Sequence, residues 1–309
     1  MKNSGAWLEN KEIVLKQFWK NLFVGEISPD KYSILQYTQS KDIDIDIEKN
    51  YIPLLVSIKK VLEGFSKEEQ RLMEYAIKNM AEELFMIEGS HKEVIAFNEN
   101  SILVMFELDQ YSNKNDFTEL IKTSCQMLIK VVKQHFKMII SCYVGIQDSI
   151  YMIPNQIEKL QVIDFQNVAY QDISLLESYK HYHIEYNNSM FSVWSELIQS
   201  NKFYRVLDEI KQMLTAEESL KKIDRKFLQN FYQDYYYILI VFSVKRNIFL
   251  SELFGDDKSL RTFQNALNSL DSLLDWVEYT IEVIKTFVDR NESIVNPVDK
   301  TKKHIENHI

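Results

Sequence analysis

Tyr51-Ile52-Pro53-Leu54-Leu55-Val56-Ser57-Ile58 is an apolar run of strand-forming residues, and from it onward the sequence alternates between strand and helix patterns. Ser66 is predicted to cap the next helix, because Glu69 completes a Ser-x-x-Glu capping box and apolar residues then recur at helical spacing. Gly89 is the expected end of that helix. The sequence therefore predicts a strand followed by a long amphipathic helix.

A hairpin is predicted next, with arms over 93–97 and 102–108 around the polar turn Asn98-Glu99-Asn100-Ser101. A helix over 116–134, a strand over 137–145 and a helix over 155–170 follow it. The resulting order β-α-β-β-α-β-α predicts a ferredoxin-like sheet with helices on one face.

The strand patterns disappear after about residue 175, and long helical patterns replace them over 175–199, 201–215, 223–247 and 259–290. Gly255-Asp256-Asp257 is the clearest break among them. Aromatic residues are frequent in this half, and at helical spacing they are typical of a helix core. The expected fold class is α+β, with segments over 1–48 (connector helices), 49–173 (α/β domain), 174–292 (helical domain) and 293–309 (the start of a further domain).

The N-terminal helix carries a short heptad pattern. Leu8, Leu15 and Leu22 stand seven residues apart, with Phe18 between the last two. Such a stripe either packs on its own domain or forms the seam of a parallel dimer. The pattern covers too few heptads to decide between these alternatives.

Glycine usage excludes several enzyme classes. The six glycines, at 5, 25, 64, 89, 145 and 255, never cluster, so neither G-x-G-x-x-G nor G-x-x-x-x-G-K-[ST] is present. The G-x-S-x-G motif of the α/β-hydrolases is missing as well. Phosphate-cradling loops and that nucleophile turn are therefore not expected.

Charge and cysteine content bear on the cellular compartment of the protein and on its binding to nucleic acids and membranes. Lysine and arginine number 36 against 45 acidic residues, and the net charge of −9 opposes unspecific binding to nucleic acid or anionic membranes. Cys125 and Cys142 form no C-x-x-C pair and are typical of core thiols in a reducing cytosol. The longest apolar run, over 235–244, is too short to cross a bilayer. We expect a soluble cytoplasmic protein without membrane contact.

No catalytic, cofactor-binding or metal-binding residues are predicted. The alternation Asp42-Ile43-Asp44-Ile45-Asp46-Ile47 lacks the glycine and the bidentate glutamate of a calcium loop, and a solvated edge or linker is expected instead. His304 and His308 stand four apart but do not form an H-E-x-x-H motif, so a solvated surface is expected there.

Several blocks resemble YesN-type response regulators of the AraC family: 18–22 (FWKNL), 51–58 (YIPLLVSI) and 75–84 (YAIKNMAEEL). Looser matches follow in the same order at 167–169, 231–234, 253–254 and 275–278. In that family a phosphorylated receiver precedes this region and an AraC-type pair of helix-turn-helix units follows it. Neither is expected within these 309 residues, and 298–309 is similar to the opening helix of the DNA-binding domain.

The resemblance also implies that the α/β domain is a degenerate relative of the GGDEF nucleotide-cyclase fold. The turn that would read Gly-Gly-Asp-Glu reads Asn98-Glu99-Asn100-Ser101 here, and the metal-binding aspartate expected at the end of the first strand falls near Ser57. Because Glu99 alone cannot assemble a two-metal site, cyclase activity is not expected.

The expected function is that of a non-catalytic connector and dimerisation region, which transmits a signal within a regulator of transcription. We expect a homodimer that reaches DNA only through the missing C-terminal domain. A small-molecule sensor is the alternative, with an apolar pocket in the aromatic-rich helical domain or at its junction with the α/β domain. A closed cavity lined by several of Tyr232, Tyr235, Tyr236 and Trp276 would favour it. A nucleotide-processing enzyme is a third, disfavoured by the missing glycines and carboxylates.

Overall fold

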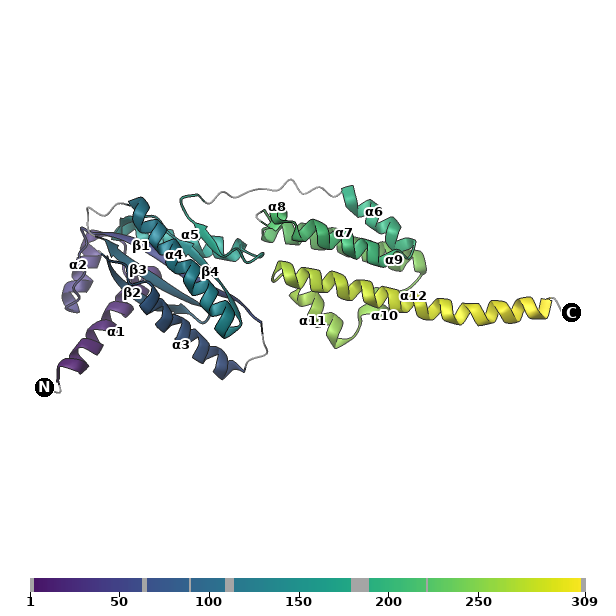
Figure 1. Cartoon of the computed structure of the whole chain (residues 1–309), viewed down its shortest axis with the longest axis horizontal. Coiled ribbons are helices and arrows are strands. Elements are labelled where there is room, and N and C mark those ends of the chain that lie inside the picture. Colours follow the sequence, from purple (N-terminus) through teal and green to yellow (C-terminus); the bar gives the residue numbers. More distant parts are fainter. Residues whose placement is uncertain are drawn as a thin grey trace. The chain divides into compact units, whose positions relative to one another are not determined.

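The structure, a computed structural model of the chain, describes residues 3–62, 66–88, 90–108, 114–178, 189–220 and 222–306. It divides into two compact units, coloured along the chain in Figure 1: Met1–Gln166 with Tyr170–Lys180, and Asn167–Ala169 with His181–Ile309. We call them the sheet unit and the helical unit. The described residues are mixed α+β, with a six-stranded sheet in the first unit and helices in the second.

The sheet unit follows the predicted order of strands and helices, with α1 and α2 before it and two short strands added, β5 between β4 and α5 and β6 after α5. Its described α-helices and strands are α1 (Asn3–Phe23), α2 (Lys31–Ser40), β1 (Asn50–Val61), α3 (Lys67–Leu84), β2 (Ser90–Asn98), β3 (Ser101–Leu108), α4 (Lys114–Val131), β4 (Met138–Val144), β5 (Asp148–Ser149), α5 (Ile153–Gln166) and β6 (Ile173–Leu175). The main strand order is β2-β3-β1-β4-β6, and β5 pairs with β1. All pairs are antiparallel except β4 with β6.

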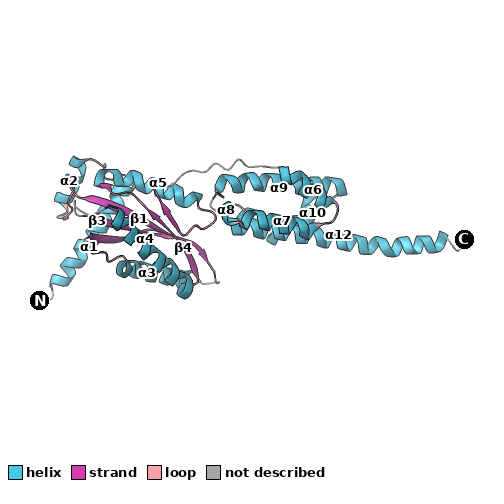
Figure 2. Cartoon of the chain, turned by 45° about the horizontal axis from the view of Figure 1, so that its top comes forward, coloured by secondary structure: helices cyan, strands magenta, loops and turns pink. Residues whose placement is uncertain are grey.

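Helices cover both faces of the sheet, which corrects the expectation of helices on one face (Figure 2). One core joins the sheet to α3 and α4, and the other joins it to α1, α2 and α5. The cause is visible in β1, where every residue from Tyr51 to Val56 is buried. A strand whose consecutive side chains are all apolar must be covered on both sides, because successive side chains point to opposite faces.

The heptad residues of α1 pack mainly within the chain. Phe18 and Leu22 are fully buried in the core on the α5 side of the sheet, and Leu15 lies half-buried against it. Trp19 fixes the helix further, with its ring 5.4 Å from that of Tyr51. The side chain of Leu8 lies outside the described residues. In this arrangement Phe18 and Leu22 do not face outward, as a dimer seam would require.

Local signals in the sheet unit are realised as predicted. The Ser66 hydroxyl accepts from the Glu69 N–H, and the Glu69 carboxylate accepts from the Ser66 N–H, which completes the capping box. Residues 43–46 form no helix or strand, and their isoleucines pack half-buried against the α1 core while Asp44 and Asp46 remain exposed. Gly89, the expected helix end, lies outside the described residues.

The helical unit contains α6 (Ser189–Gln199), α7 (Phe203–Thr215), α8 (Glu217–Leu220), α9 (Arg225–Arg246), α10 (Leu250–Phe254), α11 (Asp257–Asn265) and α12 (Leu270–Glu306) among its described elements. Its core confirms the expected role of the aromatic stripe, since Phe231, Tyr235 and Phe242 are fully buried. Tyr237 is the exception and is 65% exposed.

Two helix boundaries in this half differ from the prediction. The pattern over 175–199 begins too early, because Ile173–Leu175 is the strand β6 and α6 starts only at Ser189. The sheet unit consequently extends past the predicted boundary at 173. The pattern over 259–290 is two helices, because the Ser269 hydroxyl accepts from the Ser272 N–H at 3.1 Å and starts a new helix at Leu270.

The second of these helices, α12, also runs much further than predicted. It spans 37 residues and reaches Glu306, so the separate helix expected near Val298 is its continuation. Pro297 lacks a backbone N–H and removes one hydrogen bond from the ladder without ending the helix. Within the described part of the chain, no helix combines the length and the hydropathy needed to cross a lipid bilayer.

Candidate functional site

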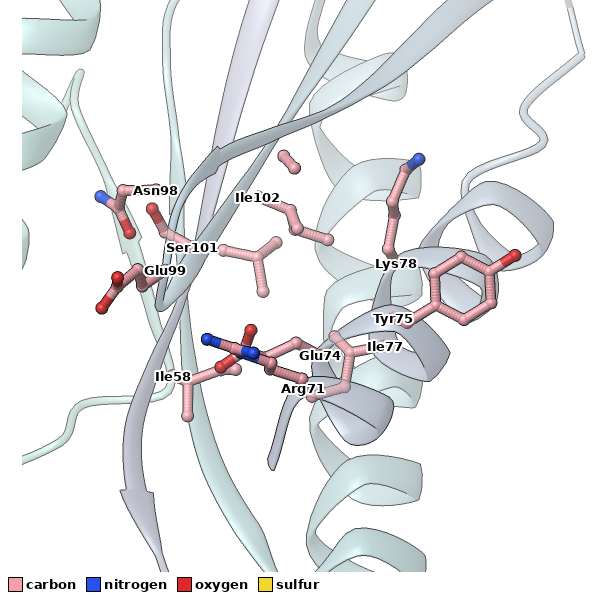
Figure 3. A pocket seen from close by; sticks show the side chains of 12 residues that line it. Ile58, Arg71, Glu74, Tyr75, Ile77, Lys78, Asn98, Glu99, Ser101 and Ile102 are labelled. Atoms are coloured by element: carbon pink, nitrogen blue, oxygen red, sulfur yellow. The ribbon is translucent and has the colours of Figure 1, made fainter. Parts of the chain in front are cut away.

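A cleft of about 290 Å³ opens between α3 and the β2–β3 hairpin (Figure 3). We call it the hairpin cleft. It is lined by Val56, Ile58, Arg71, Glu74, Tyr75, Ile77, Lys78, Ala96, Asn98, Glu99, Ser101 and Ile102. These residues come from α3 and from three neighbouring strands of the sheet, at the end where the hairpin turns.

One face of α3 forms the first wall. Arg71, Glu74, Tyr75 and Lys78 follow the spacing i, i+3, i+4, i+7, which places them along one side of a helix. Ile77, only 2% exposed, packs into the core below and fixes the rotation of the helix. The capping box at Ser66 fixes where the helix begins, and both constraints together set the position of the charged side chains.

The floor of the cleft is aliphatic and comes from the sheet. Val56 and Ile58 belong to β1, Ala96 to β2 and Ile102 to β3. The hairpin is held against β1 by the Ile58 N–H, which donates to the Asn100 carbonyl at 2.8 Å. A register shift between Ala96 and Asn98 marks an irregularity just before the turn.

Charged groups gather above this floor without pairing closely. Among the described side chains, Arg71, Glu74 and Glu99 form no ion pair, whereas Lys78 pairs with Glu82 at 3.6 Å. Burial raises the pKa of the Glu74 carboxyl, and the negative charge of Glu99 raises it further, while Arg71 partly opposes both effects. The negative charge of Glu99 therefore disfavours the ionised form of Glu74.

Three of the four residues of the predicted degenerate turn line the hairpin cleft: Asn98, Glu99 and Ser101. Asn100 is exposed in the turn, and its N–H donates to the Asn98 Oδ1 at 2.9 Å. Ser101 is 7% exposed and lies on β3 two residues before Leu103, which belongs to the core on the α5 side. By strand alternation its side chain faces that side, so Ser101 lines the cleft with its backbone.

The position expected to match a metal-binding aspartate, Ser57, also turns away from the cleft. Its hydroxyl donates to the Asp164 Oδ2 on α5 at 3.2 Å, and Asp164 pairs with Lys59 at 2.6 Å. The residues that the structure describes contain no group of three or more His, Cys, Asp or Glu side chains placed to hold a metal ion.

The aromatic residues singled out for a ligand pocket pack against one another instead. The ring of Trp276 lies 4.4 Å from that of Tyr232 and 5.2 Å from that of Tyr235, and Tyr232 stacks on Tyr236. Trp276 and Tyr235 are fully buried. This ring-on-ring packing counts against a cavity among these four side chains.

Sequence reasoning missed the wall of the cleft on α3. Arg71, Glu74, Tyr75 and Lys78 carry a detectable signal, because their spacing places them on one helix face. The spacing does not indicate which element of the fold lies opposite this face of α3. That follows from the strand order, which brings the hairpin next to β1 and beneath α3.

We expect Glu74→Gln to be more stabilising at about pH 7 than at about pH 4. A carboxyl whose pKa is raised by folding supports the folded state in its protonated form, and this support is lost as the pH rises through the folded-state pKa. Glutamine has no such loss. Urea unfolding at both pH values measures the difference, with Glu83→Gln on the exposed side of α3 as the matched control. A pH-independent effect of Glu74→Gln would contradict the electrostatic account of the cleft.

A comparison with models of known protein families finds no match to this chain, and a search of curated proteins finds none either. The function is therefore inferred from the chain's own residues and geometry.

Proposed function

We propose that the chain is the non-catalytic connector and dimerisation region of a YesN-type response regulator of the AraC family, acting in the cytoplasm to control transcription. The sheet unit would be a degenerate GGDEF-like domain of the ferredoxin-like type. Two observations support this assignment: the strand order β2-β3-β1-β4 with its two helices α3 and α4, and the turn at Asn98–Ser101, which lacks paired glycines. In that setting a receiver and AraC-type DNA-binding units would flank the chain.

The observation that carries the proposal is the continuity of α12. Leu273, Trp276 and Ile284 place its first half in the core of the helical unit, and the same helix continues to Glu306. A helix held in a packed core moves with that core, so a rotation of the helical unit would be passed to whatever α12 supports. This is a mechanical connection that needs no bound group.

The test is a change of helical phase in the full-length regulator. Two residues inserted after Arg290 turn the rest of α12 by about 200°, whereas seven residues bring it to within about 20° of two full turns. We expect the first insertion to abolish signal-dependent transcription of a reporter and the second to retain it. Equal output from both insertions would contradict transmission through α12.

Dimerisation, the second part of this proposal, needs a surface other than Phe18 and Leu22. Ile13, 65% exposed on the same helix, is a large apolar side chain that a second copy can reach. We expect the chain to self-associate in sedimentation velocity experiments and Ile13→Asp to weaken that association. Tyr32→Asp, at a site 75% exposed on α2, is the control. A wild-type chain that stays monomeric at high concentration would remove the dimer from the proposal.

A second candidate function, small-molecule sensing, is favoured by the hairpin cleft. The cleft combines an aliphatic floor with a few polar groups above it, which is the usual composition of a small-molecule site. A ligand held between α3 and the hairpin would stiffen this side of the sheet unit. Such a change is a physical input that a connector could transmit.

A further inference from the structure

We propose that the helical unit binds a small phosphate ester with a hydroxylated body, such as a sugar phosphate, in a cavity between the start of α7 and α12. We call this cavity the corner pocket. It has a volume of about 360 Å³ and is lined by Asn201, Lys202, Phe203, Tyr204, Arg205, Lys285, Val288 and Asp289. Such a ligand is not part of the connector function proposed above.

Packing holds the base of the corner pocket in place. Phe203 and Val288 are buried and belong to the core of the helical unit. The Lys285 Nζ donates to the Tyr204 Oη at 2.6 Å, so α12 and the first turn of α7 are also linked directly. The base is therefore formed before a ligand arrives, and ordering it costs little of the binding free energy.

Three cations at this corner lack a carboxylate partner among the residues that the structure describes. Lys285 donates to the neutral hydroxyl of Tyr204, and the Arg246 Nη2 donates to the neutral Asn201 Oδ1 at 2.7 Å. Neither of these cations forms an ion pair with a described carboxylate, and Lys202 forms none either. Although the whole chain has a net charge of −9, these unpaired cations provide a local positive charge that attracts an anion.

The charges of the lining match a phosphate group. Among the described residues that line the pocket, Lys202, Arg205 and Lys285 are cations, and Asp289 is the one carboxylate. The Arg205 Nε donates to the Glu209 Oε1 at 2.9 Å, but the two terminal nitrogens of Arg205 have no hydrogen-bond partner among the described residues. A phosphate ester carries a charge of about −1.5 to −2 at neutral pH and offers three acceptor oxygens. The first turn of α7, which no side chain caps, adds a smaller positive potential.

Asp289 and Tyr204 define the body of the ligand. The Asp289 carboxylate has no hydrogen-bond or ion-pair partner among the described residues. It repels a second phosphate group but accepts hydrogen bonds from hydroxyl groups. The Tyr204 ring is 50% exposed and offers an apolar surface to the carbon atoms between those hydroxyls. A cavity of about 360 Å³ is at the lower end of small-molecule sites, which suits a compact sugar phosphate better than a dinucleotide.

The corner pocket lies at the point where α12 leaves its core. Val288 is the last residue of α12 in that core among the described side chains, and the helix continues to Glu306. A phosphate bound between Lys202 and Lys285 would tie the start of α7 to this turn of α12 and would hold the helix more firmly where it leaves the unit. This regulatory role rests on the proposed connector function, whereas the binding itself does not.

The first test is isothermal titration calorimetry of the whole chain with glycerol 3-phosphate, ribose 5-phosphate and glucose 6-phosphate. At least one of these esters should bind. The same compound without its phosphate should bind at least about tenfold more weakly, the loss expected for one charged hydrogen-bonded contact. Inorganic phosphate should also bind about tenfold more weakly, because it lacks the hydroxyls that meet Asp289. Equal affinity for inorganic phosphate would overturn the hydroxylated body, and a chain that binds none of the three esters would overturn the site.

Variants locate the site. Lys202→Gln and Lys285→Gln should each weaken binding of the ester by about tenfold. Lys226→Gln is the matched control, because it removes the same charge from an exposed position at the start of α9, whereas Arg246 stands at the end of that helix. Lys202 is exposed, so its replacement should leave the fold intact by circular dichroism. Equal losses in all three variants would show unspecific attraction of anions and overturn the corner pocket.

Asp289→Ala tests the body of the ligand separately. The variant removes a negative charge from the pocket, so inorganic phosphate should bind at least as tightly as it does to the wild-type chain. It also removes the acceptor for the hydroxyls, so the preference for the ester over inorganic phosphate should fall severalfold. An unchanged preference would overturn the hydroxyl contact.

Hydrogen exchange read by mass spectrometry then separates binding from regulation. The bound ester should slow exchange over 203–207 and 284–290 but not over 225–232, at the other end of α9. Slower exchange confined to other segments would place the ligand outside the corner pocket and overturn the site. In the full-length regulator the ester should change reporter output for the wild-type protein but not for Lys202→Gln. Binding without such a change would overturn the regulatory role, while the connector function is decided by the insertions after Arg290.

Discussion

Replacing Trp276 with alanine is expected to lower the free energy of unfolding of the helical unit by about 4 kcal/mol, the usual cost of deleting a buried tryptophan side chain. The side chain of Trp276 is fully buried. Its ring stacks on that of Tyr232 and packs edge to face with those of Tyr235 and Phe263, whose ring centroids lie 5.2 and 5.4 Å away. Alanine would leave a cavity bordered by three rings that cannot all move into it. Trp276 anchors the first half of α12 in this core, and the same helix continues to Glu306. Losing the tryptophan side chain would therefore also weaken the attachment of α12 to the helical unit.

The measurement is urea unfolding combined with hydrogen exchange read by mass spectrometry. Peptides from α9 and the first half of α12 should lose protection, whereas those from β1 and β3 should keep it, because the sheet unit has its own cores. Tyr237→Ala is the matched control, since that ring is 65% exposed on α9 and its loss should change stability by less than about 0.5 kcal/mol.

Trp276→Phe refines the same experiment. The indole N–H of Trp276 is buried and has no hydrogen-bond partner among the described residues. Phenylalanine keeps a ring against Tyr232 and removes this unsatisfied donor, so the loss should be clearly smaller than for alanine. An alanine variant as stable as the phenylalanine variant would show that the aromatic cluster does not hold the unit together.

The parts of the fold that could be predicted from the sequence depend on residues close together in the chain. The capping box joins Ser66 to Glu69, three positions apart, and the hairpin needs only its polar turn and two apolar arms. Each of these signals is complete within a few residues. They can therefore be recognised without knowing which distant element packs against them.

The parts that could not be predicted depend on distant partners. The apolar stripe on α1 predicts that Phe18 and Leu22 pack against another apolar surface. It does not indicate whether that surface belongs to a second copy or to the sheet of the same chain. The hairpin cleft poses the same problem, because Arg71 and Glu74 look like solvated helix residues until the strand order brings the β2–β3 hairpin next to α3. The end of α12 was missed for a different reason: the prediction ended the helical pattern at 290 and expected a separate helix over 298–309, whereas one helix continues through Pro297 to Glu306.

Gly145→Ala is expected to destabilise the sheet unit by about 3 kcal/mol, the sum of an overpacking cost and lost hydrogen bonds. A Cβ at this position would lie 2.5 Å from the Pro53 Cγ and 2.7 Å from the Gln156 Oε1. The proline ring cannot turn aside, because Pro53 is part of β1 and its carbonyl accepts from the Gly145 N–H at 2.7 Å. Either the ends of β1 and β4 separate or Gln156 moves.

Moving Gln156 is itself costly. Its side chain accepts from the Ile146 N–H at 2.7 Å and donates to the Ile146 carbonyl at 2.9 Å, so it ties α5 to the loop after β4. Gln156 is 5% exposed, and its displacement would leave these backbone groups without their partner inside the protein. The single methyl group therefore acts on the strand pair and on the α5 contact together.

Gly25→Ala separates this steric effect from the general cost of replacing glycine. Gly25 has φ of +80° and nothing within 4 Å of an added Cβ, so alanine there should cost about 1 kcal/mol through backbone strain alone. Urea unfolding followed by circular dichroism compares the two variants, and Gly145→Ala should be the more damaging although its backbone is unstrained. If the two losses were equal, the close approach of β1, β4 and α5 at Gly145 would not be what the fold requires there.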